Sequence, residues 1–174
     1  MTTYNDTSEQ LLQHASKLGP SVFTISKEIF EEIPQFSFWT GASLPDQHHY
    51  GKHGLVYHTT EVVKIMTSTK QALNLEIPDD QIFLAGLFHD IGKVWDYKPT
   101  NPEFTEWTGT QHKRRIHHIS RSALVWNKAV DKTGLFTDIN DDITHAILAH
   151  YNYLKHTFTT YLQHFLSKFT HVPA

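Results

Sequence analysis

The chain has 174 residues, of which 39% are hydrophobic and 19% charged, so a single compact core is expected. Eighteen acidic residues against fifteen Lys and Arg give a formal charge of -3, which excludes a chain-wide basic surface for duplex nucleic acid. The absence of Cys excludes disulfides and thiolate chemistry and leaves nitrogen and oxygen as metal ligands. No stretch has the apolar length of a membrane span, so we expect a soluble, cytoplasmic protein that does not contact membranes.

The hydrophobic periodicity predicts helices joined by loops along the whole chain. In residues 1–34, Thr7 and Gln10 have capping-box spacing and Pro34 is a stop signal, which together predict two N-terminal helices. Residues 35–52 carry Gly, Pro and polar residues without a period and are expected to form a long loop. Residues 53–170 are expected to form a metal-binding helical core.

Within that core, the segment 96–109 has two Pro and a Gly and is expected to be an irregular connection. Gly134 is expected to close the helix that precedes it. No strand alternation, internal repeat or domain boundary is found, so the predicted fold class is all-α, with residues 1–174 as a single-domain helical bundle. The helices are predicted at about 53–73, from Pro78 to about Lys93, at about 110–130, from about Asp141 to His150, and at 158–169.

Histidine is unusually abundant, with 14 residues scattered along the chain and no polyhistidine run. His89 and Asp90 adjoin at the end of an apolar helix, and Lys93 follows one turn later. Burying these groups is costly without a partner, and a divalent cation is an economical one because imidazole and carboxylate suit Zn, Mn, Fe, Co or Ni. Lys93 would then face whatever anion the metal binds.

Three further histidines lie on apolar helix faces, namely His58, His118 and His150. Any one of them alone is most simply a hydrogen-bonded core histidine. Inward nitrogen ligands from four separate helices are hard to explain by packing alone. The sequence therefore predicts that His58, His89 and Asp90 bind a metal ion and that His118 and His150 are ligands of a second ion.

These residues resemble the HD-domain metal-dependent phosphohydrolases, which are named for their His-Asp doublet. The resemblance is greatest to the HD domain of bacterial 3′-to-5′ exoribonucleases, followed by that of relaxase-type proteins, and it runs from about Thr40 to His150. The His118-Ile119 and Ala149-His150-Tyr151 positions match more loosely. The motifs that carry it are LAGLFHDIGK at 84–93, which is the most specific, GLVYHT at 54–59, TGAS at 40–43 and HHY at 48–50.

The resemblance implies a helical bundle in which His58, His89 and Asp90 hold one metal and Asp90 bridges to a second metal completed by His118 and His150. It implies hydrolysis of a phosphoester by a metal-activated water, with Asp90 and Lys93 as catalytic residues and Lys93 also contacting phosphate. The expected cofactor is one or two divalent transition metal ions, Mn, Fe, Ni, Co or Zn. The expected partner is a nucleotide or single-stranded nucleic acid substrate, and a homo-oligomer is left open.

Other residues are candidates for binding the substrate. A basic cluster surrounds His118, and its ordinary explanation is a solvated helix face. A basic rim beside a dinuclear centre would also attract an anionic substrate despite the negative net charge. The candidates are Lys93, His49 from the long loop, and Arg114, Arg115 and Arg121 from the basic cluster.

The chain departs from the family pattern at its end. The family supplies a final Asp to the first metal, whereas this chain has no Asp after Asp142, and the corresponding position falls near Gln163. His164 or another chain is an alternative ligand. The departure favours a second hypothesis, a catalytically degenerate HD module that binds a nucleotide or a protein partner as a regulator. A di-iron oxygenase on the same scaffold is a third, and the basic cluster argues against it.

Overall fold

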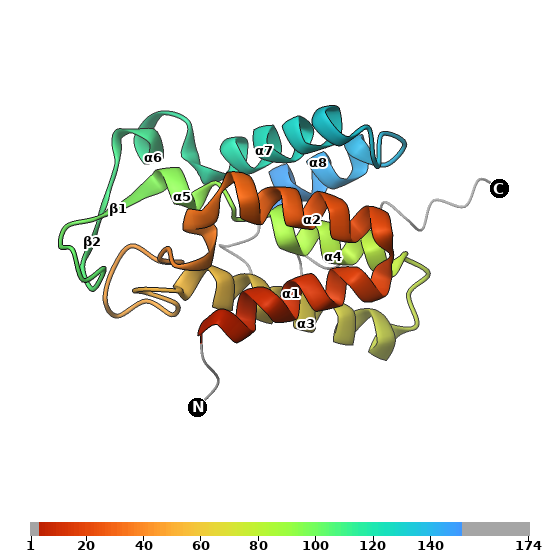
Figure 1. Cartoon of the computed structure of the whole chain (residues 1–174), viewed down its shortest axis with the longest axis horizontal. Helices are drawn as coiled ribbons and strands as arrows, with labels where there is room; N and C mark the ends of the chain where they lie inside the picture. The colour runs from red at the N-terminus through yellow and green to blue at the C-terminus, as the bar shows by residue number, and fades with distance from the viewer. Residues whose placement is uncertain (1–3, 151–174) are drawn as a thin grey trace.

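The computed structural model describes residues 4–150, which form a bundle of α-helices with a small hairpin at one end (Figure 1). The all-α fold class is therefore confirmed. The helix expected at 158–169 and the position near Gln163 lie outside the described residues. The elements are α1 (Tyr4–Leu18), α2 (Pro20–Glu32), the 3-10 helix η1 (Pro34–Ser37), α3 (Gly54–Leu73), α4 (Asp79–Phe88), α5 (Lys93–Asp96), β1 (Tyr97–Pro99), β2 (Trp107–Gly109), α6 (Gln111–Arg115), α7 (His117–Thr133) and α8 (Asn140–Ala149).

Helix α4 lies at the centre of the bundle because it is apolar on all sides. Each of residues 82–88 is buried, and the helix packs against α3 and α8 as well as α1, α2 and α7. The Phe88 ring lies 5.0 Å from the ring of Trp126 on α7, the largest of the fully buried side chains. Since α4 is enclosed by other helices, the residues that follow it, beginning with His89, enter the interior.

Helix α4 ends at Phe88, so the predicted continuous helix to Lys93 is wrong. Residues 89–92 form a tight turn, and Gly92 at its end lies directly against α7. The Gly92 N–H donates to Ser122 Oγ at 2.9 Å, and no side chain fits between the turn and the helix. This close approach brings the His-Asp pair up to the first turn of α7.

The expected irregular connection at 96–109 contains an antiparallel hairpin in which β1 pairs with β2 and Tyr97 lies opposite Gly109. Strands of three residues are too short to show an alternating pattern, which is why the sequence did not predict them. The predicted helix at 110–130 is broken near Ile116, because His117 adopts a left-handed φ of 69° that a continuous helix does not allow. Helix α7 does end at Gly134, as expected, with a left-handed φ of 68°.

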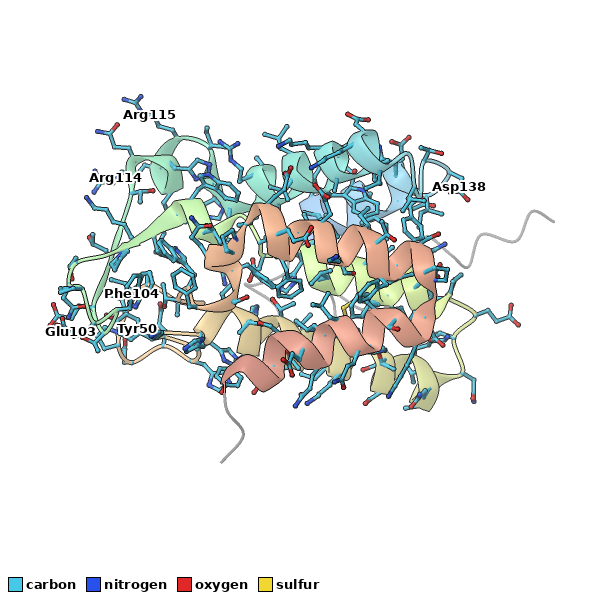
Figure 2. All side chains as sticks on the ribbon, viewed as in Figure 1. Tyr50, Glu103, Phe104, Arg114, Arg115 and Asp138 are labelled. Carbon is cyan, nitrogen blue, oxygen red and sulfur yellow. The ribbon has the colours of Figure 1, made fainter. Side chains whose placement is uncertain are left out.

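The segment 38–53 has no regular secondary structure, which agrees with most of the loop predicted at 35–52, but residues 35–37 belong to η1. Its contacts attach it to the hairpin: Trp39 Nε1 donates to the Tyr97 carbonyl at 3.0 Å, and the Trp107 N–H donates to Tyr50 Oη at 3.1 Å. Figure 2 shows Tyr50 and Phe104 together at this end of the molecule. Within residues 4–150, no helix has both the length and the apolar character needed to cross a lipid bilayer.

Candidate metal centre

Four imidazoles surround the carboxylate of Asp90, which is only 3% exposed. His58 comes from α3, His89 from the turn after α4, His118 from the first turn of α7, and His150 follows α8. Nε2 of His58 lies 2.9 Å and Nε2 of His89 lies 3.4 Å from Asp90 Oδ2, whereas Nε2 of His118 and Nε2 of His150 each lie 3.3 Å from Oδ1. The structure thus brings together all five residues that the sequence proposed as metal ligands.

The same helical spacing that buries apolar side chains delivers these imidazoles to the interior. On α8, Ile143, Ala146 and Ile147 are buried, and His150 is the next position on that face. On α3, His58 follows the fully buried Leu55 by three residues. The convergence of these imidazoles therefore follows from ordinary amphipathic packing, with His at one position of each apolar face.

Hydrogen bonds fix which ring nitrogen faces the carboxylate. Nδ1 of His89 donates to the Gly86 carbonyl at 2.7 Å, and Nδ1 of His150 donates to the Ile147 carbonyl at 2.5 Å. Nδ1 of His118 donates to the Asp96 carboxylate at 2.8 Å. Because these oxygens only accept, each Nδ1 carries a proton, and Nε2 is the ring nitrogen that can present a lone pair toward Asp90.

Burial and charge set the protonation of the centre. Burial alone would raise the pKa of Asp90, but the positive charges of Lys93 and His89 outweigh it and hold the pKa well below its ordinary value. Burial lowers the pKa of His58 to about 4, against the opposing effect of Asp90, and it also lowers the pKa of His118. At neutral pH these shifts favour an ionised Asp90 carboxylate and neutral rings at His58 and His118.

A divalent cation fits this donor set. Asp90 Oδ1 is buried and accepts no hydrogen bond within the described residues. Burying a carboxylate oxygen without a partner costs free energy, and a bound cation would offset that cost. Lone pairs that converge on a carboxylate repel one another unless a cation lies between them. Around Asp90, two sets of ligand atoms have the required proximity: His58 with His89 and Asp90, and Asp90 with His118 and His150. The residues present therefore fit one or two ions of the kind that imidazole and carboxylate bind.

Lys93 lies at the edge of this centre. Its Nζ is 2.7 Å from Asp90 Oδ2 and donates to the Gly41 carbonyl of the 38–53 loop at 2.8 Å. An ammonium has three donors, so the side chain can hold Asp90 and the loop and still offer a proton to an anion. Lys93 therefore lies beside the proposed metal ligands, and its contact with phosphate stays a prediction.

Asp96 is a buried residue beside this centre that the sequence did not single out. Its side chain is fully buried at the end of α5 and accepts hydrogen bonds from the His118 backbone N–H at 3.0 Å, from His118 Nδ1 at 2.8 Å and from His112 Nδ1 at 2.8 Å. Burial would raise its pKa, but the hydrogen bonds from His118 and His112 lower it. The only signal in the sequence was a carboxylate between two aromatic residues, Trp95 and Tyr97. Asp96 therefore holds the ring of His118 in the orientation a metal ligand needs.

Replacing Asp96 by Asn is expected to weaken metal binding by about 10- to 100-fold, because an amide cannot accept from all the donors that now meet the carboxylate. Isothermal titration of metal-free protein with Mn²⁺ measures the effect. Asp131→Asn, an exposed substitution on α7, is the matched control and should titrate like the wild type. Equal affinities for the two variants would show that Asp96 does not orient the ligand.

The basic residues proposed for substrate binding separate into two groups. Arg121 Nε donates to His112 Nε2 at 3.1 Å, and its guanidinium lies 5.3 Å from the centre of the Trp95 ring. Arg121 therefore belongs to the hydrogen-bond network of His112, Asp96 and His118. Arg114 and Arg115 are exposed on α6, and Figure 2 shows them projecting outward at the periphery. The structure does not bring these two side chains to the centre, and their contact with substrate stays a prediction.

His49 lies beside the centre although it comes from the loop. Its ring is 5.2 Å from the ring of His58, and its Nε2 is 2.9 Å from Glu61 Oε2 on α3. Its predicted contact with substrate is untested by the structure. His117, the neighbour of His118, stacks against that ring at 4.1 Å and begins α7.

The pKa of His58 makes a prediction for the stability of metal-free protein. Its folded pKa of about 4 lies below the ordinary 6.5, so the unfolded chain binds more protons between these values and the free energy of unfolding falls as pH is lowered through this window. The His58 contribution is about 3 kcal/mol across the whole window. Urea unfolding of chelator-treated protein at pH 7, 6 and 5 measures the slope. His58→Asn should flatten it, and an unchanged slope would contradict the burial of a neutral ring.

Comparison with protein-family models finds the HD domain at residues 55–164, which is more than half of the chain. The chain therefore belongs to the HD domain family, whose members are generally metal-dependent hydrolases. The comparisons with curated proteins and with solved structures found no match. The more specific resemblance to exoribonuclease HD domains stays a prediction.

Proposed function

We propose that this chain is a metal-dependent phosphohydrolase that cleaves a phosphoester of a nucleotide or of the 3′ end of single-stranded nucleic acid. In this proposal His58, His89 and Asp90 hold one divalent ion, and His118 and His150 share Asp90 with a second. The observation that carries it is the convergence of Nε2 lone pairs, with their Nδ1 protons committed elsewhere, on one buried and ionised carboxylate. Such an arrangement is costly to build unless it binds cations.

Bound divalent cations supply Lewis acidity and lower the pKa of a water molecule so that it is a nucleophile near neutral pH. Asp90 Oδ2 faces His58 and His89, and Oδ1 faces His118 and His150, so this one carboxylate would supply an oxygen to an ion at each position. Lys93 Nζ, 2.7 Å from Asp90 Oδ2, holds the carboxylate in place and directs positive charge toward an arriving phosphate. The buried walls of the centre limit water and strengthen these interactions.

The substrate class rests on the charge around the centre. Arg121 is linked to the centre through His112 and Asp96, and His49 adjoins His58, so both are placed to influence an anionic ligand. Arg114 and Arg115 on α6 extend the same positive charge outward, where they would meet a longer substrate before it reaches the metals. These basic side chains, which extend from the centre to the surface, are the reason to propose a nucleotide or a single-stranded 3′ end rather than a neutral substrate.

The proposal is tested on full-length protein purified without a His tag. Elemental analysis is expected to find a tightly bound transition metal, and a panel of phosphoesters with added Mn²⁺, Ni²⁺ or Co²⁺ is expected to release phosphate or nucleotide. The panel should include mononucleotides, cyclic nucleotides and single-stranded RNA with a free 3′ end. A metal-loaded protein that hydrolyses none of these would overturn the assignment.

A regulatory HD module is the second candidate, because the sequence lacks an Asp after Asp142 to complete the first metal position. A neutral ligand near Gln163 would hold that ion less tightly than a carboxylate does. In this alternative the protein binds a nucleotide or a protein partner without turnover. Nucleotide binding by metal-free protein, measured by equilibrium dialysis, would favour it over the enzyme.

A further inference from the structure

A second cluster of ligand atoms lies outside the centre described above. Nε2 of His48 and Nε2 of His49 lie 3.4 Å and 2.9 Å, respectively, from the same oxygen, Oε2 of Glu61. We propose that His48, His49 and Glu61 form an additional binding site for a divalent cation, at the rim of the buried centre. This site goes beyond the proposed function and does not depend on hydrolysis.

The two separations from Glu61 Oε2, 3.4 and 2.9 Å, fall in the same range as the separations at the proposed first metal position. There, the separations among Nε2 of His58, Nε2 of His89 and Asp90 Oδ2 are 2.9, 3.2 and 3.4 Å. Ligands about 2.0 to 2.2 Å from one ion lie about 2.8 to 3.6 Å apart when the angles at the ion are between octahedral and tetrahedral. All three ligand atoms of the rim cluster lie within 4.8 Å of one another. Two imidazoles and one carboxylate are also a ligand set that transition metals bind.

The backbone is arranged to bring the two neighbouring rings to one side. Successive side chains in an extended segment point in opposite directions. His49 instead adopts a left-handed φ of 64°, and the ring centres of His48 and His49 are 3.8 Å apart. The Gly41 N–H donates to the His49 carbonyl at 3.0 Å, and a Cβ at Gly54 would lie 1.8 Å from that same oxygen. Gly41 thus holds His49 in a backbone conformation that L-residues rarely adopt, and Gly54 leaves room for it. In this conformation the rings of His48 and His49 lie on the same side of the chain.

The rim cluster adjoins the buried centre. Glu61 follows His58 by three residues on α3 and so lies on the same side of that helix. The rings of His49 and His58 are 5.2 Å apart. His48 and Glu61 are exposed, with 81% and 52% of their side chains accessible, so the remaining coordination positions of an ion would be open to water or to an anion. A cation here would neutralise Glu61, whose charge opposes the approach of phosphate.

The test is the number of Co²⁺ ions bound by full-length, tag-free protein, measured by equilibrium dialysis with elemental analysis. The variants are His48→Ala and Glu61→Gln, singly and together, and Lys64→Ala is the matched control because it is an exposed residue one turn beyond Glu61. We expect the double variant to bind one ion fewer than the wild type and the control, with the tightly held ions retained. The single His48→Ala variant should weaken the same ion by at least tenfold.

Because His48 is exposed, its replacement does not disturb the core, and the far-ultraviolet circular dichroism should be unchanged. Equal Co²⁺ stoichiometry in wild-type and double-variant protein would overturn the proposal. If the proposed phosphohydrolase function is wrong, the result is different. The wild type would then bind metal both at the centre around Asp90 and at the rim cluster, but it would hydrolyse no phosphoester. Loss of one ion in the variants would still support the rim site in that case.

Discussion

Replacing Asp90 by Asn is expected to abolish tight metal binding and to lower phosphoester hydrolysis by about three orders of magnitude or more. The physical reason is that both carboxylate oxygens are committed: His58 and His89 face Oδ2, and His118 and His150 face Oδ1. An amide offers one weak oxygen ligand and places an N–H where a lone pair is required. Elemental analysis and the phosphoester panel measure the two losses.

Asp138→Asn is the control for this substitution, because Asp138 is exposed and Figure 2 shows it at the end of the molecule away from the hairpin. It makes the same chemical change and should keep the metal content and activity of the wild type. If Asp90→Asn also kept its metal, the bridging role of this carboxylate would be refuted. Circular dichroism of both variants separates loss of metal from loss of fold.

Replacing Gly92 by Ala is expected to cost about 3 kcal/mol of folding free energy and to weaken the metal position formed by His118. A Cβ at this residue would lie 2.1 Å from the His118 carbonyl oxygen and 2.8 Å from the carbonyl carbon. Both atoms are backbone, so the clash is relieved only by moving α7 away from the turn that carries Asp90. Urea unfolding of metal-free protein and Mn²⁺ titration measure the two effects.

Gly109→Ala is the matched control, since the nearest atom to its new Cβ is Lys113 Cδ at 3.5 Å, an ordinary contact. It should change stability and metal affinity by no more than about 0.5 kcal/mol, as expected for an exposed surface position. A Gly92→Ala variant that resembled this control would contradict the close packing of the turn on α7. Comparing the two variants therefore separates the effect of the clash at Gly92 from any general effect of an added methyl group.

The periodicity of the sequence predicted the helices well where the apolar stripes are long. The helix from Gly54 to Leu73 and the end of α7 at Gly134 lie within a residue or so of their predicted positions. The prediction was wrong where a tertiary contact sets the backbone. The turn after Phe88 exists because Gly92 packs on α7, and the break before α7 requires the left-handed conformation of His117. Neither feature leaves a periodic signal.

The sequence by itself determined the residues capable of metal chemistry, because a His-Asp doublet and histidines on apolar helix faces are visible as residue types at fixed spacing. Only the tertiary structure decided that four distant imidazoles face one carboxylate. The tertiary structure also decided that His118 is held by a hydrogen-bond chain through Asp96, His112 and Arg121, and that Glu61 contacts both His48 and His49. Sequence periodicity reports which side of a helix is buried, whereas hydrogen bonds between elements depend on how the helices pack and on local backbone angles. That packing is a property of the whole chain.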